Sequence, residues 1–590
     1  MPKIIAERFS IMNISGAKIV VETLIEQGCD TVFGYPGGQV INLFDELYVN
    51  RNRIKHVLAA HEQGASHAAD GYARATGKVG VCIATSGPGA TNLVTGIATA
   101  YLDSVPMVAI TGNVPCGLLG RDSFQEVDIV GITMPVTKHN FIVKDVTELA
   151  DTLRTAFKIA KSGRPGPVLV DIPKDVQIAK CDFEPKQEPV RPYPLSFVSD
   201  SKLRRAAEMI KNSQRPFIYF GGGVISGKAS EELVKLAEKI DSPMGCSLMG
   251  LSAVPYDHPK FLGMTGMHGH YASSVAQDEA DLVITLGARF SDRATGDKKR
   301  FNKNFSIIHI DIDSSELDKN ITSQLSVQGD IKDALHRLIP MLEEVKRPEW
   351  ESRLAELREE EARRLESAEK AVFEKKCEDC ESKCTMCGVP AEKRLNPYKI
   401  IDIVSSKADA ADVVITDVGQ HQMWTAQRYP LKKPRTLLTS GGLGTMGYGM
   451  GAAIGAAAAT GRRSILFTGD GSFGMNLNEL ATSVTQNIPL VIVVMNNGVL
   501  GMVRQWQTLF FDKHYSNTTL DRKTDFVKLA EAFGAKAARV TTAEELEKAA
   551  DEAFSFGGTY LIDCAVDCNE FVLPMLPPGG SIEDIITEIK

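Results

Sequence analysis

The sequence predicts an α/β protein built from three doubly wound parallel-sheet domains, and three observations support this. Short runs rich in Val and Ile alternate with longer amphipathic stretches along the 590 residues, as buried parallel strands alternate with helices. Two changes of composition divide the chain into parts of domain size. The outer thirds also resemble each other, whereas the middle third differs from both.

The expected strands are apolar runs bounded by turn residues. They cover residues 54–58, 78–85, 105–111, 168–172, 216–220, 282–286, 307–312, 464–468 and 490–495. Runs this short and apolar favour strands buried on both faces.

The two changes of composition set the domain boundaries. Residues 183–200 carry four prolines and read as an extended linker, and residues 341–376 are dense in Glu, Lys and Arg, as in a solvated helix. We therefore expect an N-terminal domain over 10–182, a central domain over 198–345, a charged helix and Cys-rich linker over 346–395, and a C-terminal domain over 396–590.

An internal echo relates the outer domains. The dipeptide Ala-Thr recurs at 98–99 and 481–482, and a proline opens an apolar run at 106 and again at 489, so both pairs are 383 residues apart. Two related α/β domains would flank a different one; chance similarity between strand-helix-strand units is the alternative.

Composition excludes several classes of partner. Lys and Arg number 66 against 74 Asp and Glu, a net charge of −8 that argues against a nucleic-acid ligand. No apolar run approaches the ~18 residues of a membrane helix. The first residues lack the features of a signal or transit peptide, so we expect a cytoplasmic protein.

A pair of polar turns carries the strongest chemical signal. Gly469-Asp470-Gly471-Ser472 follows one expected strand, and Asn496-Asn497 follows the next. The carboxyl ends of neighbouring parallel strands meet at one sheet edge, where ligands bind in open α/β sheets. Glycines and a helix N-terminus suit a phosphate, and the oxygens of Asp470 and Asn497 suit Mg²⁺. A lone Gly-Asp-Gly is usually only a turn, but the pairing with Asn-Asn is specific.

With these motifs the chain resembles the thiamine diphosphate enzymes. The resemblance implies that Asp470, Asn497 and the carbonyl of Val499 bind Mg²⁺. It also implies a glutamate on the N-terminal domain that hydrogen-bonds the aminopyrimidine ring of the cofactor, and Glu62 occupies that position after the strand 54–58. Taken alone, Glu62 beside His61 would be a solvated loop charge.

A closer resemblance, to the catalytic large subunit of acetohydroxyacid (acetolactate) synthases, covers residues 14–580. The matching stretches are 33–38, 86–92, 123–126, 137–140, 163–168, 417–424, 444–449 and 501–506. In that family the outer domains bind the pyrimidine and the diphosphate, and the middle domain binds FAD. The further thiamine diphosphate contacts that it implies are Gln420, His421, Gly444, Met446, Gly471, Ser472 and Met502.

The middle third resembles the family's flavin site. The implied FAD contacts are Arg164, Gly222, Gly223, Met267, His268, Arg289, Asp311, Ile312 and Asp330. One residue departs from the family motif, because Ser291 stands where an Asp is common; both neighbouring arginines remain. The flavin is expected to be architectural, without net redox turnover.

The substrate residues also follow from the resemblance. Arg293 would hold the carboxylate of a second ketoacid, for which a guanidinium fork is suited, and Trp506 would shape the pocket around an extra methyl. Phe124, Gln125 and Lys138 match residues near the substrate entrance. Read without the family, Arg293 is a flavin or surface ion pair and Trp506 an ordinary buried aromatic residue.

The implied activity is acetolactate synthase. Pyruvate is decarboxylated on thiamine diphosphate, and its hydroxyethyl unit passes to a second pyruvate or to 2-ketobutyrate. The products are 2-acetolactate or 2-aceto-2-hydroxybutyrate, on the route to valine, leucine and isoleucine. The alternatives are a pyruvate oxidase-type flavoenzyme on the same scaffold and a catalytically silent subunit that only binds partners.

The family further implies a homodimer or homotetramer with sites at the chain interface and a small regulatory subunit. One feature lies outside the family pattern: Cys377, Cys380, Cys384 and Cys387 crowd together. They suggest Zn²⁺ or an iron–sulfur cluster, or else free thiols in a linker. The other seven cysteines are expected to be reduced thiols.

Overall fold

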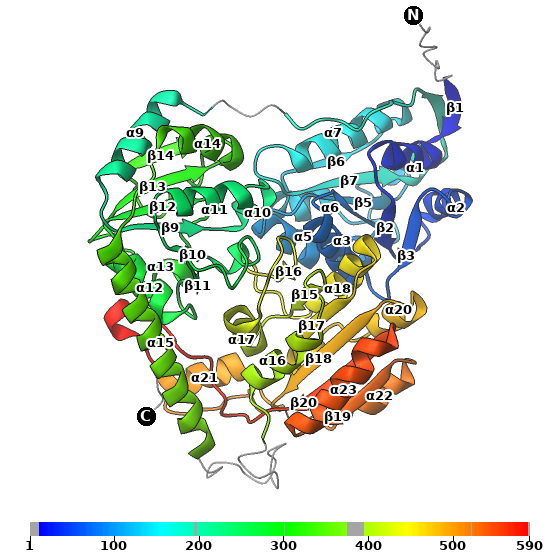
Figure 1. Ribbon diagram of the computed structural model, residues 1–590. Coiled ribbons are helices and arrows are strands. Elements are labelled where there is room, and N and C mark those ends of the chain that lie inside the picture. Colours follow the sequence, from blue (N-terminus) through cyan, green and yellow to red (C-terminus); the bar gives the residue numbers. More distant parts are fainter. Residues whose placement is uncertain (1–10, 194–197, 300, 375–393, 521, 588–590) are drawn as a thin grey trace, which may run out of the picture. The chain divides into compact units, whose positions relative to one another are not determined.

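The computed structural model describes residues 11–193, 198–299, 301–374, 394–520 and 522–587 (Figure 1). They form two compact units. The first contains residues 11–193, Gly442–Arg462 and Asn476–Ile488, and the second contains residues 198–441, Arg463–Met475 and residues 489–587. The four predicted segments divide the chain more finely than these two units do, and their boundaries stay predictions.

The first unit is organised around a six-stranded sheet in which every pairing is parallel. Its strands are β2 (Thr31–Gly34), β3 (Lys55–Leu58), β4 (Gly80–Ala84), β5 (Met107–Asn113), β6 (His139–Ile142) and β7 (Pro167–Pro173), in the order β3-β2-β4-β5-β7-β6. Its longer helices are α1 (Gly16–Glu26), α2 (Ile41–Val49), α3 (Glu62–Thr76), α5 (Val94–Leu102), α7 (Leu149–Lys161) and α18 (Tyr448–Thr460). Antiparallel strands β1 (Met12–Ser15) and β8 (Lys180–Phe183) lie apart from this sheet.

The second unit contains two further parallel sheets. The middle sheet has β9 (Pro216–Phe220), β10 (Met244–Cys246), β11 (Phe261–Met264), β12 (Leu282–Leu286), β13 (Ser306–Asp311) and β14 (Leu325–Gln328), in the order β11-β10-β9-β12-β13-β14. Its helices include α9 (Asp200–Asn212), α10 (Gly222–Ser226), α11 (Ser230–Lys239), α12 (Tyr271–Glu279), α13 (Asp292–Thr295), α14 (Ile331–Leu338) and α15 (Pro348–Glu374). This strand order is the one found in dinucleotide-binding folds.

The C-terminal sheet repeats the order of the first unit's sheet. Its strands are β15 (Val413–Thr416), β16 (Leu437–Leu438), β17 (Ser464–Gly469), β18 (Leu490–Asn496), β19 (Lys536–Val540) and β20 (Thr559–Ala565), in the order β16-β15-β17-β18-β20-β19. Accompanying helices are α16 (Pro397–Lys407), α17 (Gln420–Arg428), α19 (Asp470–Phe473), α21 (Gly501–Phe510), α22 (Phe526–Ala532) and α23 (Ala543–Phe556). The same order in both sheets supports the internal echo, and the three-domain α/β prediction is confirmed.

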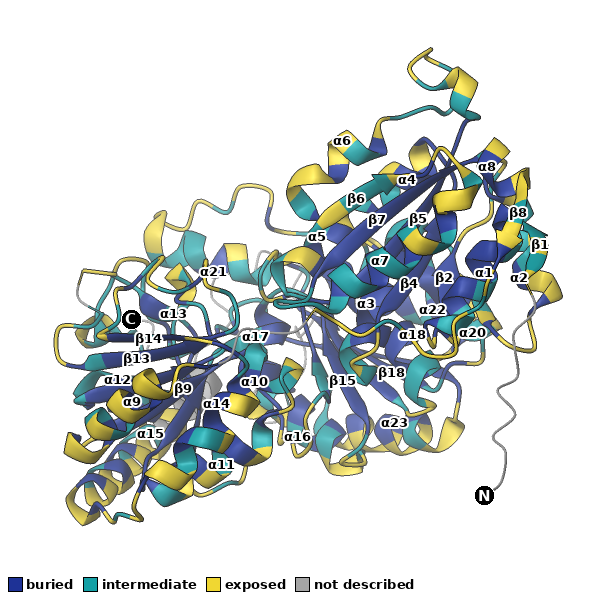
Figure 2. Ribbon diagram, turned by 90° about the horizontal axis from the view of Figure 1, so that it is seen from above, coloured by how far each residue is buried: buried dark blue, intermediate teal, exposed yellow. Residues whose placement is uncertain are grey.

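Apolar residues explain where the strands form. The strands of all three sheets are largely buried, as Figure 2 shows in dark blue, and each predicted strand lies within two residues of an observed one. The segment 341–376, predicted to be a solvated helix, contains α15, which is buried along one face. Trp350, Leu354 and Leu357 of α15 form a buried stripe that packs on the middle sheet, because their spacing places them on one helix face.

Two helices in the first unit pack with their backbones in contact. A Cβ on Gly455 of α18 would lie 1.9 Å from the Ala68 carbonyl of α3, and one on Gly71 would lie 2.2 Å from the Ala452 carbonyl. The Tyr448 hydroxyl also donates to the buried Asp70 carboxylate at 2.7 Å. Glycine is therefore required where α3 and α18 meet.

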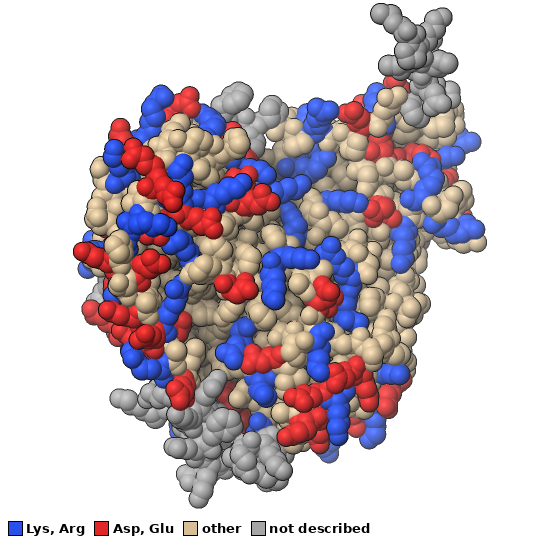
Figure 3. All heavy atoms as spheres, in the orientation of Figure 1, with Lys and Arg blue, Asp and Glu red and all other residues tan. Residues whose placement is uncertain are grey.

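Basic and acidic side chains are interspersed on the face shown in Figure 3. In the part of the chain that the structure describes, no helix is both long and apolar enough to cross a bilayer. The seven cysteines outside the cluster are free thiols, as predicted. Cys377, Cys380, Cys384 and Cys387 lie outside the described residues, so their prediction is not tested.

Candidate cofactor and substrate sites

The two polar turns of the motif meet at one edge of the C-terminal sheet. Strands β17 and β18 are paired with Gly469 opposite Met495, so Asp470 and Asn497 leave neighbouring strands at their carboxyl ends. Asp470 is the first residue of α19 and is 7% exposed, and Asn497 is 9% exposed. The predicted convergence of two oxygen ligands therefore agrees with the strand register.

The start of α17 joins the same edge. The Asn497 amide donates to the Gln420 side-chain carbonyl at 3.2 Å. A Cβ on Gly501, at the start of α21, would lie 1.9 Å from that carbonyl oxygen, and a Cβ on Gly469 would lie 3.0 Å from Nδ1 of His421. Glycines thus allow two turns and two helix N-termini to converge, an arrangement that favours anions.

The electrostatics of this edge fit a diphosphate and a divalent cation. Burial raises the pKa of Asp470 to about 7, an effect opposed by the backbone N–H groups of its own turn. A cation would restore the stabilisation that burial withdraws from the carboxylate. Burial lowers the pKa of His421 to about 3, and its buried Nε2 has no hydrogen-bond partner, so a polar ligand atom would satisfy it.

Two residues of this network, Gln505 and Glu570, were missed by sequence reasoning. Gln505 is fully buried, and its carbonyl accepts from the Gln420 amide at 3.1 Å. Gln420 also donates to the backbone carbonyl of Glu570 at 2.8 Å, and burial raises the pKa of the Glu570 carboxyl to about 8. The available signal was the place of Gln505 in the stretch 501–506; nothing local singled out Glu570.

The other residues of the C-terminal sheet's edge that were predicted to contact the cofactor or Mg²⁺ lie close in sequence to Asp470 and Asn497. Gly471 and Ser472 are buried in α19, and Met502 lies in the first turn of α21. Val499 is 6% exposed and donates its N–H to the side-chain oxygen Oδ1 of Asn497 at 3.2 Å. Their proposed contacts with the cofactor stay predictions.

In the first unit, the sequence around Glu62 builds a helix start. His61 is the N-cap of α3 and accepts the Gln63 N–H through Nδ1 at 3.1 Å. Glu62 is the first helical residue, where negative charge is favoured. Its carboxylate accepts from the Asn92 amide at 2.9 Å, and a Cβ on Gly89 would lie 3.2 Å from its other oxygen. Asn92 was not predicted as a site residue, although it ends the stretch 86–92.

The first unit also holds the other predicted residues from its sequence range. Phe124 is 85% exposed, and Gln125 follows with a φ of 59°. Lys138 donates to the carbonyls of Ile159 and Ser162, both at 2.6 Å, so its amino group lies at the C-terminus of α7. Arg164 donates to the Ser104 hydroxyl at 2.7 Å. Gly444, with a φ of 69°, and Met446 lie in the loop before α18.

The predicted flavin residues follow the carboxyl ends of the middle strands. Gly222 and Gly223 begin α10 directly after β9. A Cβ on Gly223 would lie 2.7 Å from Cα of Gly287, which follows β12. Strands β9 and β12 are neighbours where the strand order reverses, and ligands of open α/β sheets bind at such a point.

Other side chains of the middle domain lie along the same edge. Met267 and His268 follow β11, Arg289 follows β12, Asp311 ends β13 with Ile312 after it, and Asp330 is the N-cap of α14. Among the described residues, Nδ1 of His268 and the hydroxyl of Thr285 are buried without a hydrogen-bond partner. Unpaired polar atoms at the predicted edge fit a polar ligand such as the flavin.

Three predicted residues that are distant in sequence meet in the second unit. The guanidinium of Arg293 lies 5.6 Å from the centre of the Trp506 ring, and its Nη1 lies 3.6 Å from Sδ of Met267. The Arg293 side chain is 59% exposed and also lies 3.7 Å from the Asp292 carboxylate. The structure thus brings the predicted carboxylate-binding arginine to the predicted specificity residue.

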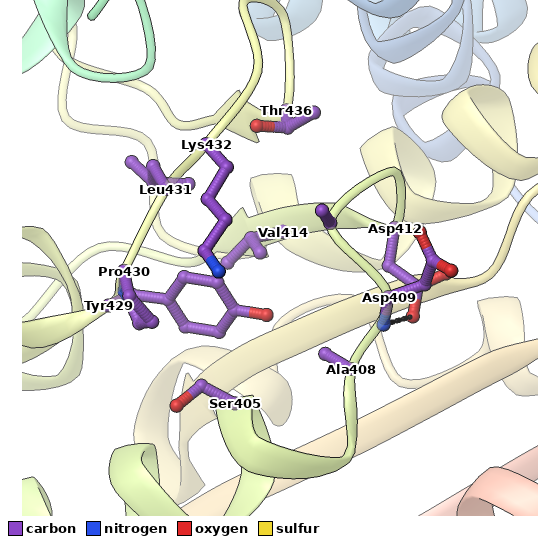
Figure 4. Close-up of a pocket in the computed structure, with 11 residues that line it drawn as sticks. Ser405, Ala408, Asp409, Asp412, Val414, Tyr429, Pro430, Leu431, Lys432 and Thr436 are labelled. Carbon is purple, nitrogen blue, oxygen red and sulfur yellow. Dashed lines mark hydrogen bonds between the residues drawn. The ribbon is translucent and has the colours of Figure 1, made fainter. Parts of the chain in front are cut away.

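A separate cavity of about 90 Å³ lies elsewhere in the second unit. Figure 4 shows Asp412, Tyr429, Lys432 and Thr436 around it. It lies at the amino end of β15, opposite the edge that carries Asp470, and contains none of the predicted site residues. Within the described residues, no three His, Cys, Asp or Glu side chains cluster as metal ligands.

Comparison with known proteins first defines the class. Family models for the thiamine pyrophosphate enzymes match in order: the N-terminal TPP binding domain at residues 14–132, the central domain at 203–338 and the C-terminal TPP binding domain at 417–564. The three matched ranges fall on the three parallel sheets, so the fold is that of this class.

Individual relatives narrow the class. A probable acetolactate synthase large subunit of Methanocaldococcus jannaschii is 43% identical over 98% of this chain and 96% of its own length. The isozyme 2 large subunit of Escherichia coli K12 is 43% identical over 98% and 100%, and the large subunit of Corynebacterium glutamicum is 44% identical over 97% and 90%. The chain belongs to the family of acetolactate synthase large subunits, so it is a thiamine pyrophosphate-dependent enzyme. The pyruvate oxidase-type alternative is not favoured.

Proposed function

We propose that this chain decarboxylates pyruvate and transfers the resulting two-carbon unit to a second 2-ketoacid. With pyruvate as acceptor the product is 2-acetolactate, and with 2-ketobutyrate it is 2-aceto-2-hydroxybutyrate. One observation carries this proposal: the buried Asp470, Asn497, Gln420 and His421 converge at the edge of the C-terminal sheet in a chain of this family.

The residues of that edge would hold the cofactor. Asp470, Asn497 and the Val499 carbonyl would bind Mg²⁺, whereas His421 and the N-termini of α17 and α21 would receive the diphosphate. When bound, thiamine diphosphate supplies an electron sink for the carbon that loses CO₂. Burial matters because a low dielectric strengthens each of these electrostatic contacts.

Glu62 would act on the aminopyrimidine ring. Its carboxyl group would share a proton with a ring nitrogen, and the Asn92 amide fixes the direction of the carboxylate through the 2.9 Å hydrogen bond. A side chain at position 89 would crowd the other oxygen of this carboxylate, because a Cβ there would lie 3.2 Å from it.

Arg293 would bind the carboxylate of the acceptor ketoacid. Its exposed guanidinium can offer two parallel N–H donors to a carboxylate, while Trp506 beside it gives the acceptor's alkyl group an apolar surface. The flavin would occupy the edge between β9 and β12, where the unpaired Nδ1 of His268 and the close-packed Gly223 lie, and would serve the architecture of the site.

The partner assignments come from the family. The relatives are named large subunits, so we propose a smaller regulatory partner, and a homodimer or homotetramer as the catalytic assembly. The cytoplasmic location stays a prediction from composition and motifs.

A product assay tests the function. Purified protein is incubated with pyruvate, thiamine diphosphate, Mg²⁺ and FAD, and acetolactate, peroxide and acetyl phosphate are measured. Acetolactate is the expected main product, and a competition between pyruvate and 2-ketobutyrate then gives the acceptor preference. Peroxide or acetyl phosphate as the main product would contradict the proposal.

A further inference from the structure

A buried carboxylate from the C-terminal half of the chain holds the backbone in front of Glu62. Glu479 begins α20 (Glu479–Thr485), lies within the first unit and is 1% exposed. Its Oε1 accepts the backbone N–H of His61 at 3.0 Å, and its Oε2 accepts the N–H of Ala60 at 3.2 Å and the hydroxyl of Thr482 at 2.6 Å. Ala60 and His61 directly precede Glu62.

The helix that follows is shaped to admit this carboxylate. A Cβ on Gly64 of α3 would lie 2.0 Å from Oε1 and 2.4 Å from Cδ of Glu479. Any side chain at position 64 therefore displaces the carboxylate from the two backbone amides. Glycine is less favourable than alanine inside a helix by about 1 kcal/mol. The space that the Glu479 carboxylate needs explains why glycine nevertheless stands at position 64.

These contacts are strong enough to fix the backbone. Hydrogen bonds from N–H groups to an ionised carboxylate are about twice as strong as neutral ones. Ala60 and His61 precede the helix, so their N–H groups make no bond within it, and the Glu479 carboxylate accepts both of them. Burial raises the pKa of Glu479, and the Thr482 hydroxyl and the N–H groups of Ala60 and His61 oppose that rise without cancelling it.

We propose that Glu479 is a positioning residue for Glu62. By fixing the Ala60–His61 backbone it sets the point from which α3 starts, and hence the place of the Glu62 carboxylate beside Asn92 and Gly89. Glu479 follows the Gly-Asp-Gly turn closely in the chain. One short segment therefore contains both Asp470, a proposed Mg²⁺ ligand, and the residue that holds the backbone before Glu62. This inference rests on the proposed role of Glu62.

Two variants remove the anchor from opposite sides. Glu479→Gln keeps the shape of the side chain but points an NH₂ group at one backbone N–H. Gly64→Ala leaves Glu479 intact and places a methyl group on its oxygen. Each should lower kcat for acetolactate formation by about 10- to 100-fold, as expected when a reacting group moves by about 1 Å, with KM for pyruvate changed less than about threefold. The control Glu547→Gln removes an exposed carboxylate of α23 and should behave as the parent protein.

A readout on protein without cofactor separates positioning from catalysis. Hydrogen exchange measured by mass spectrometry on peptides that contain Ala60 and His61 should accelerate in Glu479→Gln and Gly64→Ala and not in Glu547→Gln. Unchanged exchange in both variants would overturn the proposal, as would a parental kcat in Glu479→Gln.

The double variant distinguishes this inference from the proposed function. If Glu479 acts through Glu62, adding Glu479→Gln to Glu62→Gln should lower kcat by less than about threefold further, because the two changes disable one unit. Additive losses would show that Glu479 acts by another route. A fully active Glu62→Gln variant would instead remove the proposed role of Glu62 itself.

Discussion

The two outer sheets share a strand order and differ at the edge that carries the proposed metal ligands. In the first unit the Asn113 amide, at the end of β5, donates to Asp171 of β7 at 2.6 Å; in the C-terminal sheet the Asn496 amide, at the end of β18, donates to Asp563 of β20 at 2.9 Å. The strand registers place these pairs at equivalent positions. Repetition thus extends from strand order to individual buried side chains.

The same registers show why only one of the two sheets carries the proposed metal ligands. Ser464 is level with Leu490 in one sheet as Gly80 is level with Met107 in the other. The position of Asp470 therefore corresponds to Ser86, and that of Asn497 to Val114. A valine offers no oxygen ligand from its side chain, so the shared scaffold provides the edge and a few residues decide what it binds.

The largest expected effect comes from removing the charge of Asp470, a proposed Mg²⁺ ligand at the edge of the C-terminal sheet. Asp470→Asn should lower kcat by about 1000-fold or more and abolish the Mg²⁺ dependence of thiamine diphosphate binding, because a neutral amide is a weak ligand for a hard cation. Calorimetric titration with cofactor and Mg²⁺, beside the product assay, checks this. Flavin content should equal that of the parent protein, and a variant that retains Mg²⁺-dependent binding would refute the assignment of Asp470.

Removing the charge of Glu62, in the first unit, should lower turnover by a smaller factor. Glu62→Gln should lower turnover by about 100-fold or more, in the range attributed to a positioned acid or base, while the thermal midpoint shifts by less than about 4 °C. Thiamine diphosphate binding should persist, since the proposed Mg²⁺ ligands Asp470 and Asn497 are unchanged. Turnover near the parental value would remove Glu62 from the mechanism.

A substitution at the edge of the middle sheet tests whether FAD and thiamine diphosphate bind independently. Gly223→Ala places a methyl group 2.7 Å from Cα of Gly287, and such overpacking costs about 1–3 kcal/mol. We expect the affinity for FAD to fall by about 10- to 100-fold, measured by flavin fluorescence on titration. Mg²⁺-dependent thiamine diphosphate binding should change little. Equal loss of both cofactors would mean that the two edges are not independent.

Local sequence was sufficient for the strands and for the polar turns. Buried parallel strands are continuous apolar runs, so β9 and β12 match their predicted bounds and the turns at Asp470 and Asn497 fall at strand ends. The family resemblance supplied Arg293 and Trp506, which the structure brings together. These features depend on short segments or on motifs.

Long-range pairing was beyond sequence reasoning. The contact of Glu479 with Ala60 and His61 joins residues more than 400 positions apart, and no local pattern distinguishes Glu479 from an ordinary helix-start glutamate. The buried stripe of α15 could have been found, because Trp350, Leu354 and Leu357 are spaced as one helix face. The dense charges of that segment obscured it.

The smallest expected effect separates the two equivalent aspartates. Among the described residues, Asp171 accepts hydrogen bonds from two neutral groups, the Thr111 hydroxyl and the Asn113 amide, and burial raises its pKa to about 6. Asp563 also accepts from the Arg539 guanidinium at 2.6 Å; burial raises its pKa and this arginine opposes the rise. One buried carboxylate therefore has a cation beside it, and its counterpart relies on neutral donors.

This difference predicts effects of unequal size on stability at neutral pH. Because the folded pKa of Asp171 lies above the unfolded value of about 3.9, the folded state keeps, between about pH 4 and pH 6, a proton that the unfolded state has lost. The stability it contributes is therefore present below about pH 4 and is lost as the pH rises through about 6. Asp171→Asn should remove this loss and raise the free energy of unfolding at pH 7.5 by about 1–2 kcal/mol, with little change at pH 4. The pKa of Asp563 is also raised, so Asp563→Asn should change the free energy of unfolding in the same direction but by less, because Arg539 already offsets part of the cost of the charge. Denaturant unfolding of both variants at the two pH values measures this, and an equal gain in both variants at pH 7.5 would mean that the cation beside Asp563 is not what distinguishes the two sheets.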